Sequence, residues 1–162
     1  MLRVSVLNEE GTTQIASILA GHLRMGDVIL LEGEMGTGKS VFTRALARNL
    51  GIDEPIPSPT FTILLLHKGP EFMLAHLDLY RLANEDEFYE MGLEEQVPPE
   101  DGIAVIEWPS NCPDAMPSKR IMIEIDRVPG NEQGRTVSLS FSETDRETVV
   151  RDDLLKSGLT VA

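Results

Sequence analysis

The alternation of apolar and polar positions predicts that the chain begins with a strand followed by a helix. Residues 2–7 alternate, which is typical of a strand with one buried face. Asn8 follows in the position of a helix N-cap. The helix after it has apolar residues at helical spacing, and these form its inner face: Ile15, Ile18, Leu19 and Leu23.

A second strand and helix come next. Residues 28–31 are consecutive apolar residues after the turn signal Gly26-Asp27, as expected of a buried parallel strand. A helix with regularly spaced apolar residues follows Lys39, and Gly51 is placed to end it. The turn between the strand and the helix is rich in glycine, so its backbone can approach a ligand closely.

Two hairpins account for most of the remaining apolar runs. Residues 60–66 and 72–77 flank a turn-forming segment and predict the first hairpin. Residues 120–125 and 135–141 predict the second. Each hairpin contributes an antiparallel pair of strands.

Other segments predict a short helix, a single strand and a last helix. Residues 84–95 read as an acidic helix broken by Gly92, and residues 103–106 as a buried strand. Ser142 is the predicted cap of a final helix that reaches Lys156.

Residues 33–40, GEMGTGKS, match the phosphate-binding pattern G-x-x-x-x-G-K-[ST]. Lys39 offers a mobile charge to the outer phosphates of a nucleotide, and Ser40 offers a hydroxyl to Mg²⁺. Glycines let successive backbone N–H groups converge on phosphate oxygens at three positions: Gly33, Gly36 and Gly38. Because a strand precedes the pattern and a helix follows it, the sequence predicts a site for a nucleoside triphosphate.

These elements together predict one α/β domain over residues 1–162. Two hairpins and a strand–loop–helix unit imply a mixed parallel and antiparallel sheet between helices, a three-layer fold of the P-loop NTPase type. Residues 142–162 are assigned to this domain as a C-terminal helix and tail.

Two carboxylates stand at the ends of predicted strands. Asp78 follows the run 72–77, and Glu107 follows the run 103–106. A P-loop protein needs a carboxylate at the end of a neighbouring strand to hold Mg²⁺ or its water shell near Ser40. The residues alone do not decide which of the two carboxylates has this role. Either could instead be an ordinary acidic residue that faces solvent at the end of its strand.

Charge and cysteine content narrow the classes of ligand. The 14 Lys and Arg residues against 27 Asp and Glu residues give a formal charge of −13, which disfavours a large footprint on DNA or RNA. Cys112 is the only cysteine, which excludes an internal disulfide or a multi-cysteine metal site. The start resembles no signal peptide and no run approaches about 18 apolar residues, so we expect a cytoplasmic protein.

Three further motifs follow the phosphate-binding loop in a fixed order. They are SPTF at residues 58–61, HLDLYRL at 76–82 and EWP at 107–109. Together with the loop they closely resemble the bacterial TsaE family, formerly YjeE, the ATPase component in making the tRNA base threonylcarbamoyladenosine. The resemblance covers roughly residues 1–141, and the tail from Ser142 carries no motif of the family.

The resemblance implies roles for the matched positions in ATP hydrolysis. Lys39 would hold the outer phosphates, and Ser40 and Glu107 would be the Mg²⁺ ligands. Asp78 would act on the attacking water or on the γ-phosphate region. Thr60 would lie in a mobile loop that senses the γ-phosphate.

Further candidates surround the nucleotide. By resemblance Trp108 lies beside it, although a half-buried core indole is the interpretation without the family. The segment from Asn8 to Thr12 resembles the part of the family near the adenine, although a helix cap is the interpretation without the family, and Arg135 is a candidate from the second hairpin. The family prefers Ala where this chain has Thr37 and Thr where it has Ser40, and both changes keep the needed chemistry.

Arg81 invites comparison with an arginine finger, since a planar cation near the γ-phosphate stabilises developing charge. In a chain this acidic, however, most arginines find a carboxylate, so an ion pair is the favoured interpretation. His76 lies on an apolar run, where a hydrogen-bonded core residue is favoured over a catalytic one.

No pattern recognises a second small substrate, and the charge disfavours a direct grip on tRNA. We therefore expect ATP hydrolysis to drive a conformational change in a protein partner, which by resemblance is the TsaB–TsaD assembly. The acidic surface would suit a basic docking face.

Two other classes remain as alternatives. A small-molecule P-loop kinase usually carries a lid with several arginines, whereas the segment between Met35 and Trp108 has only Arg44, Arg48 and Arg81. A non-hydrolysing nucleotide sensor would keep the loop without a site that activates water, and the two strand-end carboxylates argue against it.

Overall fold

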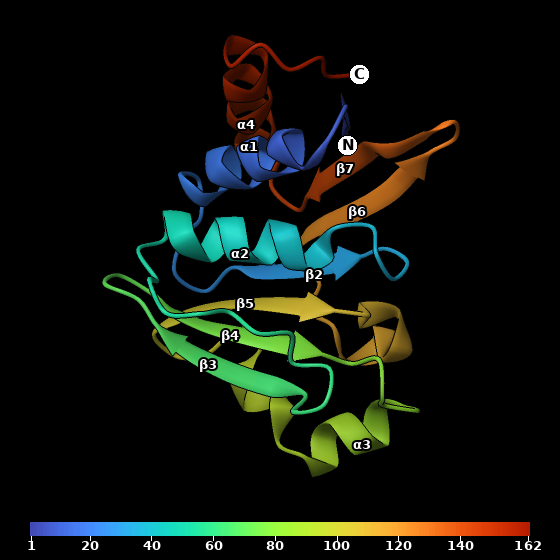
Figure 1. Cartoon of the computed structure of the whole chain (residues 1–162). Coiled ribbons are helices and arrows are strands. Elements are labelled where there is room, and N and C mark those ends of the chain that lie inside the picture. Colours follow the sequence, from blue (N-terminus) through green and yellow to red (C-terminus); the bar gives the residue numbers. More distant parts are fainter.

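A computed structural model describes all 162 residues and confirms the predicted α/β fold. Seven strands form one sheet in the order β1-β7-β6-β2-β5-β4-β3 (Figure 1). The parallel pairs are β2 with β5, β2 with β6 and β4 with β5, and the other neighbours are antiparallel. The strands are β1 (Leu2–Val6), β2 (Val28–Glu32), β3 (Leu64–Lys68), β4 (Met73–Asp78), β5 (Gly102–Glu107), β6 (Ile121–Val128) and β7 (Asn131–Phe141).

Helices cover both faces of the sheet and complete a three-layer arrangement. One face packs against α1 (Glu9–Ala20), α2 (Lys39–Asn49) and α4 (Thr144–Lys156). The other face packs against α3 (Glu85–Glu90) and the single-turn segments near it, which are η1 (Leu93–Gln96), η2 (Pro109–Asn111) and η3 (Pro113–Ala115).

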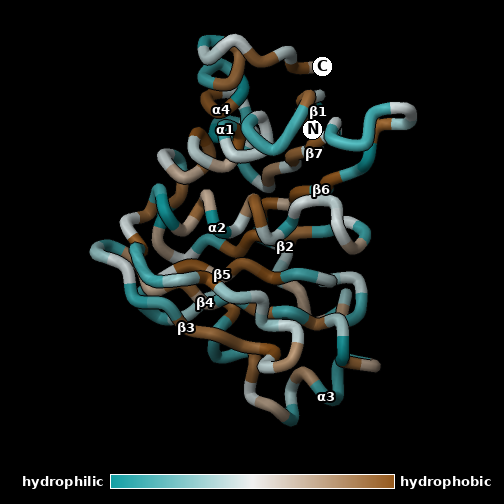
Figure 2. Tube along the Cα trace, viewed as in Figure 1, coloured by the Kyte–Doolittle hydropathy of each residue, from teal (hydrophilic) through white to brown (hydrophobic).

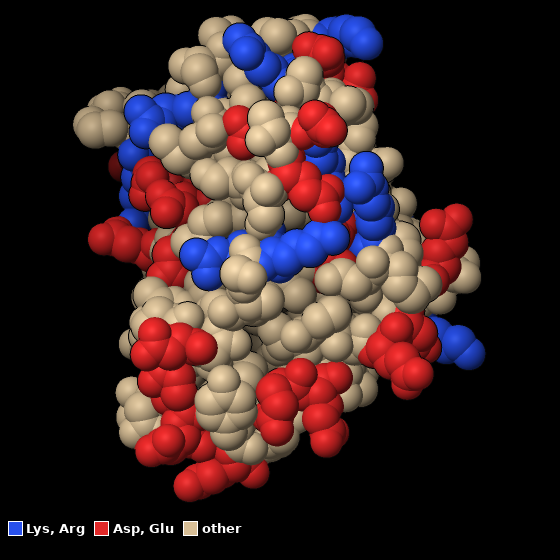
Figure 3. All heavy atoms as spheres, turned by 180° about the vertical axis from the view of Figure 1, so that it is seen from behind, with Lys and Arg blue, Asp and Glu red and all other residues tan.

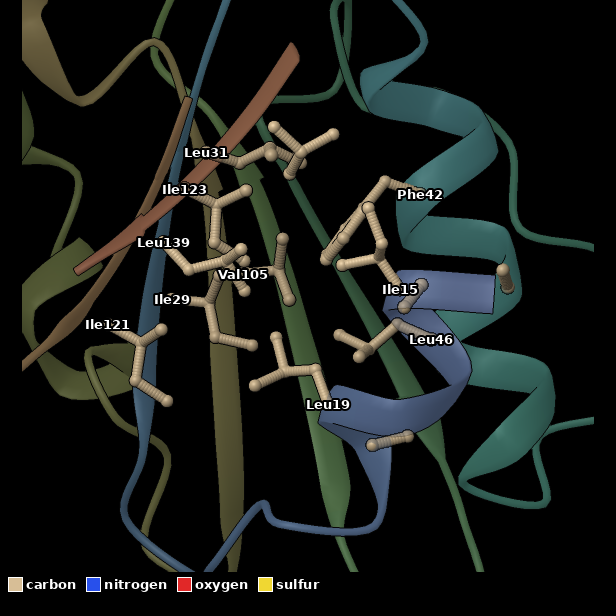
Figure 4. Close-up of a cluster of buried hydrophobic side chains, with 14 of the residues drawn as sticks. Ile15, Leu19, Ile29, Leu31, Phe42, Leu46, Val105, Ile121, Ile123 and Leu139 are labelled. Atoms are coloured by element: carbon tan, nitrogen blue, oxygen red, sulfur yellow. The ribbon is translucent and has the colours of Figure 1, made fainter. Parts of the chain in front are cut away.

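The side chains of β2 show why there is a core on each face. Ile29 and Leu31 belong to a cluster of 26 buried residues, and Val28 and Leu30 belong to a second cluster of 11. In Figure 4 the larger cluster lies between the sheet and the apolar faces of α1 and α2. Figure 2 shows the central strands β2 and β5 in the brown of hydrophobic residues. The continuous apolar run at 28–31 therefore reflects burial on both sides.

The first hairpin begins later than the sequence predicts. Residues 60–63 form a turn, in which the N–H of Ile63 donates to the carbonyl of Pro59 at 2.7 Å. Thr60 is drawn out of strand geometry because its hydroxyl binds Asp78. The residues of the SPTF motif consequently form a loop, and the strand starts only at Leu64.

The cap predicted for the last helix is wrong. Glu143 occupies the N-cap position of α4, and no side chain supplies a cap hydrogen bond there. Ser142 is used elsewhere: its hydroxyl oxygen accepts the backbone N–H of Arg120 at 2.7 Å. The serine thus fixes the start of β6 instead of the start of the helix.

Other local predictions are confirmed. Asn8 caps α1 by accepting the N–H of Gly11 at 3.4 Å, and Gly92 takes a left-handed conformation between α3 and η1. The second hairpin forms as predicted but is longer, because β6 continues to Val128 and β7 begins at Asn131.

None of the helices combines the length and the apolar character that a membrane crossing requires.

A buried ion pair fixes α4 at the amino end of β2. Arg146 donates to Asp27 at 2.6 Å, and their side chains are only 5% and 7% exposed. Arg146 also donates to Glu143 at 3.0 Å, and Asp27 accepts the backbone N–H of Arg24 at 2.7 Å. Burial opposes the charge of Arg146, but these carboxylates outweigh it and raise its pKa above the ordinary value. The last helix is therefore held to the central strand by paired charges.

Candidate nucleotide-binding site

The loop of residues 33–38 joins the carboxyl end of β2 to the first turn of α2. Gly36 and Gly38 have φ values of 79° and 107°, which residues with side chains rarely adopt. Gly33 is needed for a close approach, since a Cβ there would lie 2.7 Å from the carbonyl oxygen of Ile125. The glycines of the motif are thus explained by the backbone path of the loop.

Lys39 is buried at the mouth of this loop, with 7% of its surface exposed. Its Nζ donates to the carbonyl of Gly33 and lies 4.0 Å from the centroid of the Trp108 ring. Burial lowers the pKa of Lys39, and three carboxylates oppose that shift from a distance: Glu107, Glu32 and Asp78. A cation held by a carbonyl and a ring, without a carboxylate partner, is available to a phosphate oxygen.

Asp78 and Glu107 lie side by side at the carboxyl edge of the sheet. They are Cα partners in the parallel register of β4 and β5, and each is only 3% exposed. His76 is hydrogen-bonded to Oε2 of Glu107 at 2.8 Å, and no hydrogen bond uses the other carboxylate oxygen of Glu107. His76 is itself buried, so it orients the carboxylate from inside the sheet.

The SPTF loop reaches the same edge. The hydroxyl of Thr60 donates to Oδ2 of Asp78 at 2.9 Å and lies 2.8 Å from the hydroxyl of Ser58. The backbone N–H of Tyr80 donates to the other oxygen of Asp78, also at 2.9 Å. Asp78 is therefore held in place from two sides, by the loop and by its own strand end.

The ion pair expected for Arg81 is wrong. Arg81 forms no ion pair, and its guanidinium group lies over the ring of Phe61, 5.2 Å from the centroid. Phe61 is 81% exposed, so the two side chains stack on the outer surface of the SPTF loop. The interaction places Arg81 on the outside of this loop.

A cavity of about 370 Å³ lies between the loop, the strand ends and the SPTF segment. The predicted site residues that line it are Gly36, Gly38, Lys39, Ser40, Thr60, Asp78, Glu107 and Trp108. Sequence reasoning did not name five other lining residues individually, which are Glu9, Met35, Val41, Ser58 and Tyr80. Ser58 and Tyr80 belong to the SPTF and HLDLYRL motifs, and that membership was the available signal.

Four predicted residues do not line the cavity. Thr12 is buried within α1, and Gly33, at the start of the loop, lies close to the carbonyl of Ile125. The hydroxyl of Thr37 donates to the carbonyl of Glu34 at 2.8 Å and closes a turn inside the loop. Arg135 contacts the loop from outside. The nucleotide-binding roles of these residues stay predictions.

The side chains around the cavity fit a hard cation. Ser40 offers a hydroxyl, and Glu107 and Asp78 offer carboxylates, so the available donors are oxygens. Mg²⁺ prefers such ligands and commonly takes one or two from the protein, with phosphate and water completing its shell. The arrangement is compatible with the magnesium ligands expected from the sequence, Ser40 and Glu107.

The fold and this loop define the class of the protein. A glycine-rich loop follows the central parallel strand, a helix begins at its lysine, and two carboxylates end the next strands of the sheet. This is the arrangement of an α/β protein of the P-loop type.

Comparison with known proteins identifies the family. The model of the family described as threonylcarbamoyl adenosine biosynthesis protein TsaE matches residues 6–137. The TsaE protein of Bacillus subtilis (strain 168) is 36% identical over 132 residues, which is 82% of each chain. The TsaE protein of Rickettsia conorii is 31% identical over 153 residues, 94% of this chain and 86% of that protein.

The fold agrees with that relationship. The crystal structure of Bacillus subtilis YdiB matches with a TM-score of 0.78 and 28% identity, over 98% of this chain and 97% of that one. The chain belongs to the TsaE family, whose role lies in tRNA threonylcarbamoyladenosine biosynthesis.

Proposed function

We propose that this protein binds ATP with Mg²⁺ and hydrolyses the ATP to drive the cycle of the complex that makes threonylcarbamoyladenosine in tRNA. The observation that carries the proposal is the meeting of the phosphate loop, Lys39, Ser40 and two strand-end carboxylates on one cavity. Family membership supports the pathway.

Each side chain has a distinct task in hydrolysis. Lys39 binds the outer phosphates, and Ser40 and Glu107 hold Mg²⁺, which when bound neutralises charge on the phosphates. Asp78 positions the attacking water: the N–H of Tyr80 holds one of its oxygens, and the other, bound to the hydroxyl of Thr60, becomes available when the γ-phosphate engages that hydroxyl. His76 keeps Glu107 in the orientation that presents its second oxygen.

Thr60 is the proposed sensor of the γ-phosphate. Its hydroxyl is hydrogen-bonded to Asp78 and Ser58. A γ-phosphate or its metal would compete for the same hydroxyl, which releases Asp78 and reorders the SPTF loop. The exposed ring of Phe61, next in the chain, carries that change to the surface.

The proposed partner is the TsaB–TsaD assembly. No arginine lines the cavity, so charge on the transferred phosphoryl group is left understabilised until a partner supplies a donor or orders the loop. On the face behind the sheet, acidic side chains gather over the α3 end, a surface that suits a basic partner (Figure 3). A kinase that needs an arginine clamp is disfavoured by the same cavity.

The test is phosphate release from ATP by the protein alone and with saturating TsaB and TsaD. We expect slow hydrolysis alone and an acceleration by the partner, which in the best-studied systems reaches roughly 10³- to 10⁵-fold. Thr60→Ala should reduce the acceleration more than it reduces the basal rate. Thr62→Ala is the matched control, because Thr62 is exposed on the same loop and its hydroxyl makes no hydrogen bond to Asp78.

Rates that stay unchanged when partner binding is confirmed separately would contradict the proposal and leave ATP as an assembly signal. Transfer of the phosphoryl group to a small acceptor, in place of release to water, would identify a kinase.

A further inference from the structure

Two arginines face each other across the β6–β7 hairpin. Arg127 and Arg135 are Cα partners in its antiparallel register. Like charges directly opposite each other weaken a strand pair, so the hairpin itself gains nothing from this placement. Both side chains instead reach across to the phosphate loop at residues 33–38.

The contacts are made with consecutive carbonyls on the outer side of the loop. Arg135 donates from Nε to the carbonyl of Thr37 at 2.7 Å and from Nη2 to that of Gly36 at 3.2 Å. Arg127 donates from Nη2 to the carbonyl of Met35 at 2.6 Å and pairs with the carboxylate of Glu34 at 3.1 Å. Every carbonyl from residue 35 to residue 37 is therefore bound by a guanidinium group.

The planarity of the peptide turns these contacts into a statement about the inner side of the loop. In a trans peptide the carbonyl of one residue and the N–H of the next point in opposite directions. Carbonyls of Met35 and Thr37 that are held outward direct the N–H groups of Gly36 and Gly38 inward. Both glycines line the cavity, and no backbone hydrogen bond uses either N–H group.

We propose that Arg127 and Arg135 are positioning residues for phosphate binding, which hold the loop carbonyls outward so that its N–H donors face the ligand before it arrives. The inference rests on the proposed function of the cavity. Without the arginines, a loop peptide is free to flip, and a flipped peptide presents a carbonyl dipole to the phosphate in place of a donor.

Of the two arginines, Arg135 is expected to hold the loop more firmly. Its Nη1 also donates to the carbonyls of Glu132 and Gly134, each at 2.7 Å, so its guanidinium group is fixed by its own hairpin. Arg127 makes fewer hydrogen bonds and is more open to solvent, with 49% of its side chain exposed. The hairpin is consequently a brace for the loop, and its rigidity is transmitted mainly through Arg135.

The test measures the dissociation constant for MgADP by calorimetry, well below the melting temperature of each variant. We expect Arg135→Ala to weaken binding about tenfold and Arg127→Ala roughly threefold, from the loss of charged hydrogen bonds. Arg135→Lys should not restore affinity, because an ammonium group cannot bridge two carbonyls as the guanidinium fork does. Arg3→Ala is the control: it removes the same charge from β1, where the side chain makes no contact with the loop.

A role limited to stability would lower the melting temperature of the nucleotide-free protein and leave the affinity of the folded protein unchanged. That result, or full rescue by Arg135→Lys, would overturn the inference. Lys39→Ala serves as a reference: if it too retains MgADP affinity, the proposed site itself fails, whereas its loss beside unaffected arginine variants rejects only the brace. Because Arg127 is on the surface, its variant keeps the test decisive if Arg135→Ala does not fold.

Discussion

A buried cation lies at each end of β2, and the two differ in whether a carboxylate pairs with them. At the amino end, Arg146 meets Asp27 at 2.6 Å and Glu143 at 3.0 Å, so its charge is fully paired. At the carboxyl end, Lys39 is equally buried but binds only the carbonyl of Gly33 and the ring of Trp108.

The difference separates a charge that stabilises the fold from one that serves a ligand. A buried pair holds its elements together, and breaking it leaves an uncompensated charge. An unpaired buried cation costs stability, as its lowered pKa shows, and that cost is useful only where an anion can bind. The same strand therefore has a structural end and an end that carries the proposed nucleotide site, called below the functional end.

Lys39→Ala gives the largest expected effect and tests the functional end. Hydrolysis should fall about 10³-fold, because the compact charge on the outer phosphates is lost. The free energy of unfolding should not decrease, since a desolvated cation is removed. Phosphate release and urea denaturation measure the two quantities, with the exposed Lys68→Ala as control. Full activity in Lys39→Ala would contradict the assignment of residues 33–40 as the phosphate-binding loop.

Arg146→Ala is the mirror experiment at the structural end. Removing one partner leaves Asp27 buried and unpaired, which should cost about 3–5 kcal/mol of the free energy of unfolding. Nucleotide affinity should persist at temperatures where the protein stays folded. The control is Arg151→Ala, on the exposed side of the same helix. A loss of affinity without a loss of stability would show that the two ends are not separate.

Two substitutions test whether the two carboxylates at the functional end have different roles. Asp78→Asn should leave nucleotide binding intact and lower turnover about 10²-fold, as expected when a water-positioning group is lost. Glu107→Gln should weaken Mg²⁺-dependent binding about tenfold. A Mg²⁺ titration of binding and of turnover distinguishes them, and exchanged phenotypes would reverse the two roles.

The smallest effect concerns acid and the structural end. Hydrogen bonds from Lys119 and Arg146 lower the pKa of Glu143 below its ordinary 4.5. A lowered folded-state pKa contributes stability that is complete above pH 4.5 and is lost as the pH falls through the folded-state value. The stability advantage of the wild type over Glu143→Gln should therefore disappear in acid, which denaturation at a series of pH values measures. An advantage independent of pH would point to packing.

Local chemistry made much of the molecule predictable. The strand–loop–helix around GEMGTGKS, the two hairpins and the helix break at Gly92 follow from periodicity and turn residues, which act within a few positions. Asp78 and Glu107 could be named because each ends an apolar run. Their side-by-side placement across β4 and β5 follows from parallel strands placing their carboxyl ends at one edge.

The errors come from interactions between distant segments. Serine is a good helix-capping residue, but the hydroxyl of Ser142 instead accepts the backbone N–H of Arg120, just before β6. Thr60 leaves the strand pattern because Asp78 binds it. Arg127 gave no signal at all, since its acceptors, the carbonyl of Met35 and the carboxylate of Glu34, lie 92 and 93 residues earlier in the chain.

The pairing of β1 with β7 determines when the edge of the sheet can form during synthesis of the chain. Residues 2–6 leave the ribosome long before their hydrogen-bonding partners at residues 135–139. At about 5–20 residues per second this amphipathic segment waits for many seconds with its edge uncovered. The brace arginines arrive in the same late stage, so a nascent chain already contains the phosphate loop before it contains the residues that hold it. Newly made protein thus acquires its sheet edge and its supported loop together, on completion of the β6–β7 hairpin.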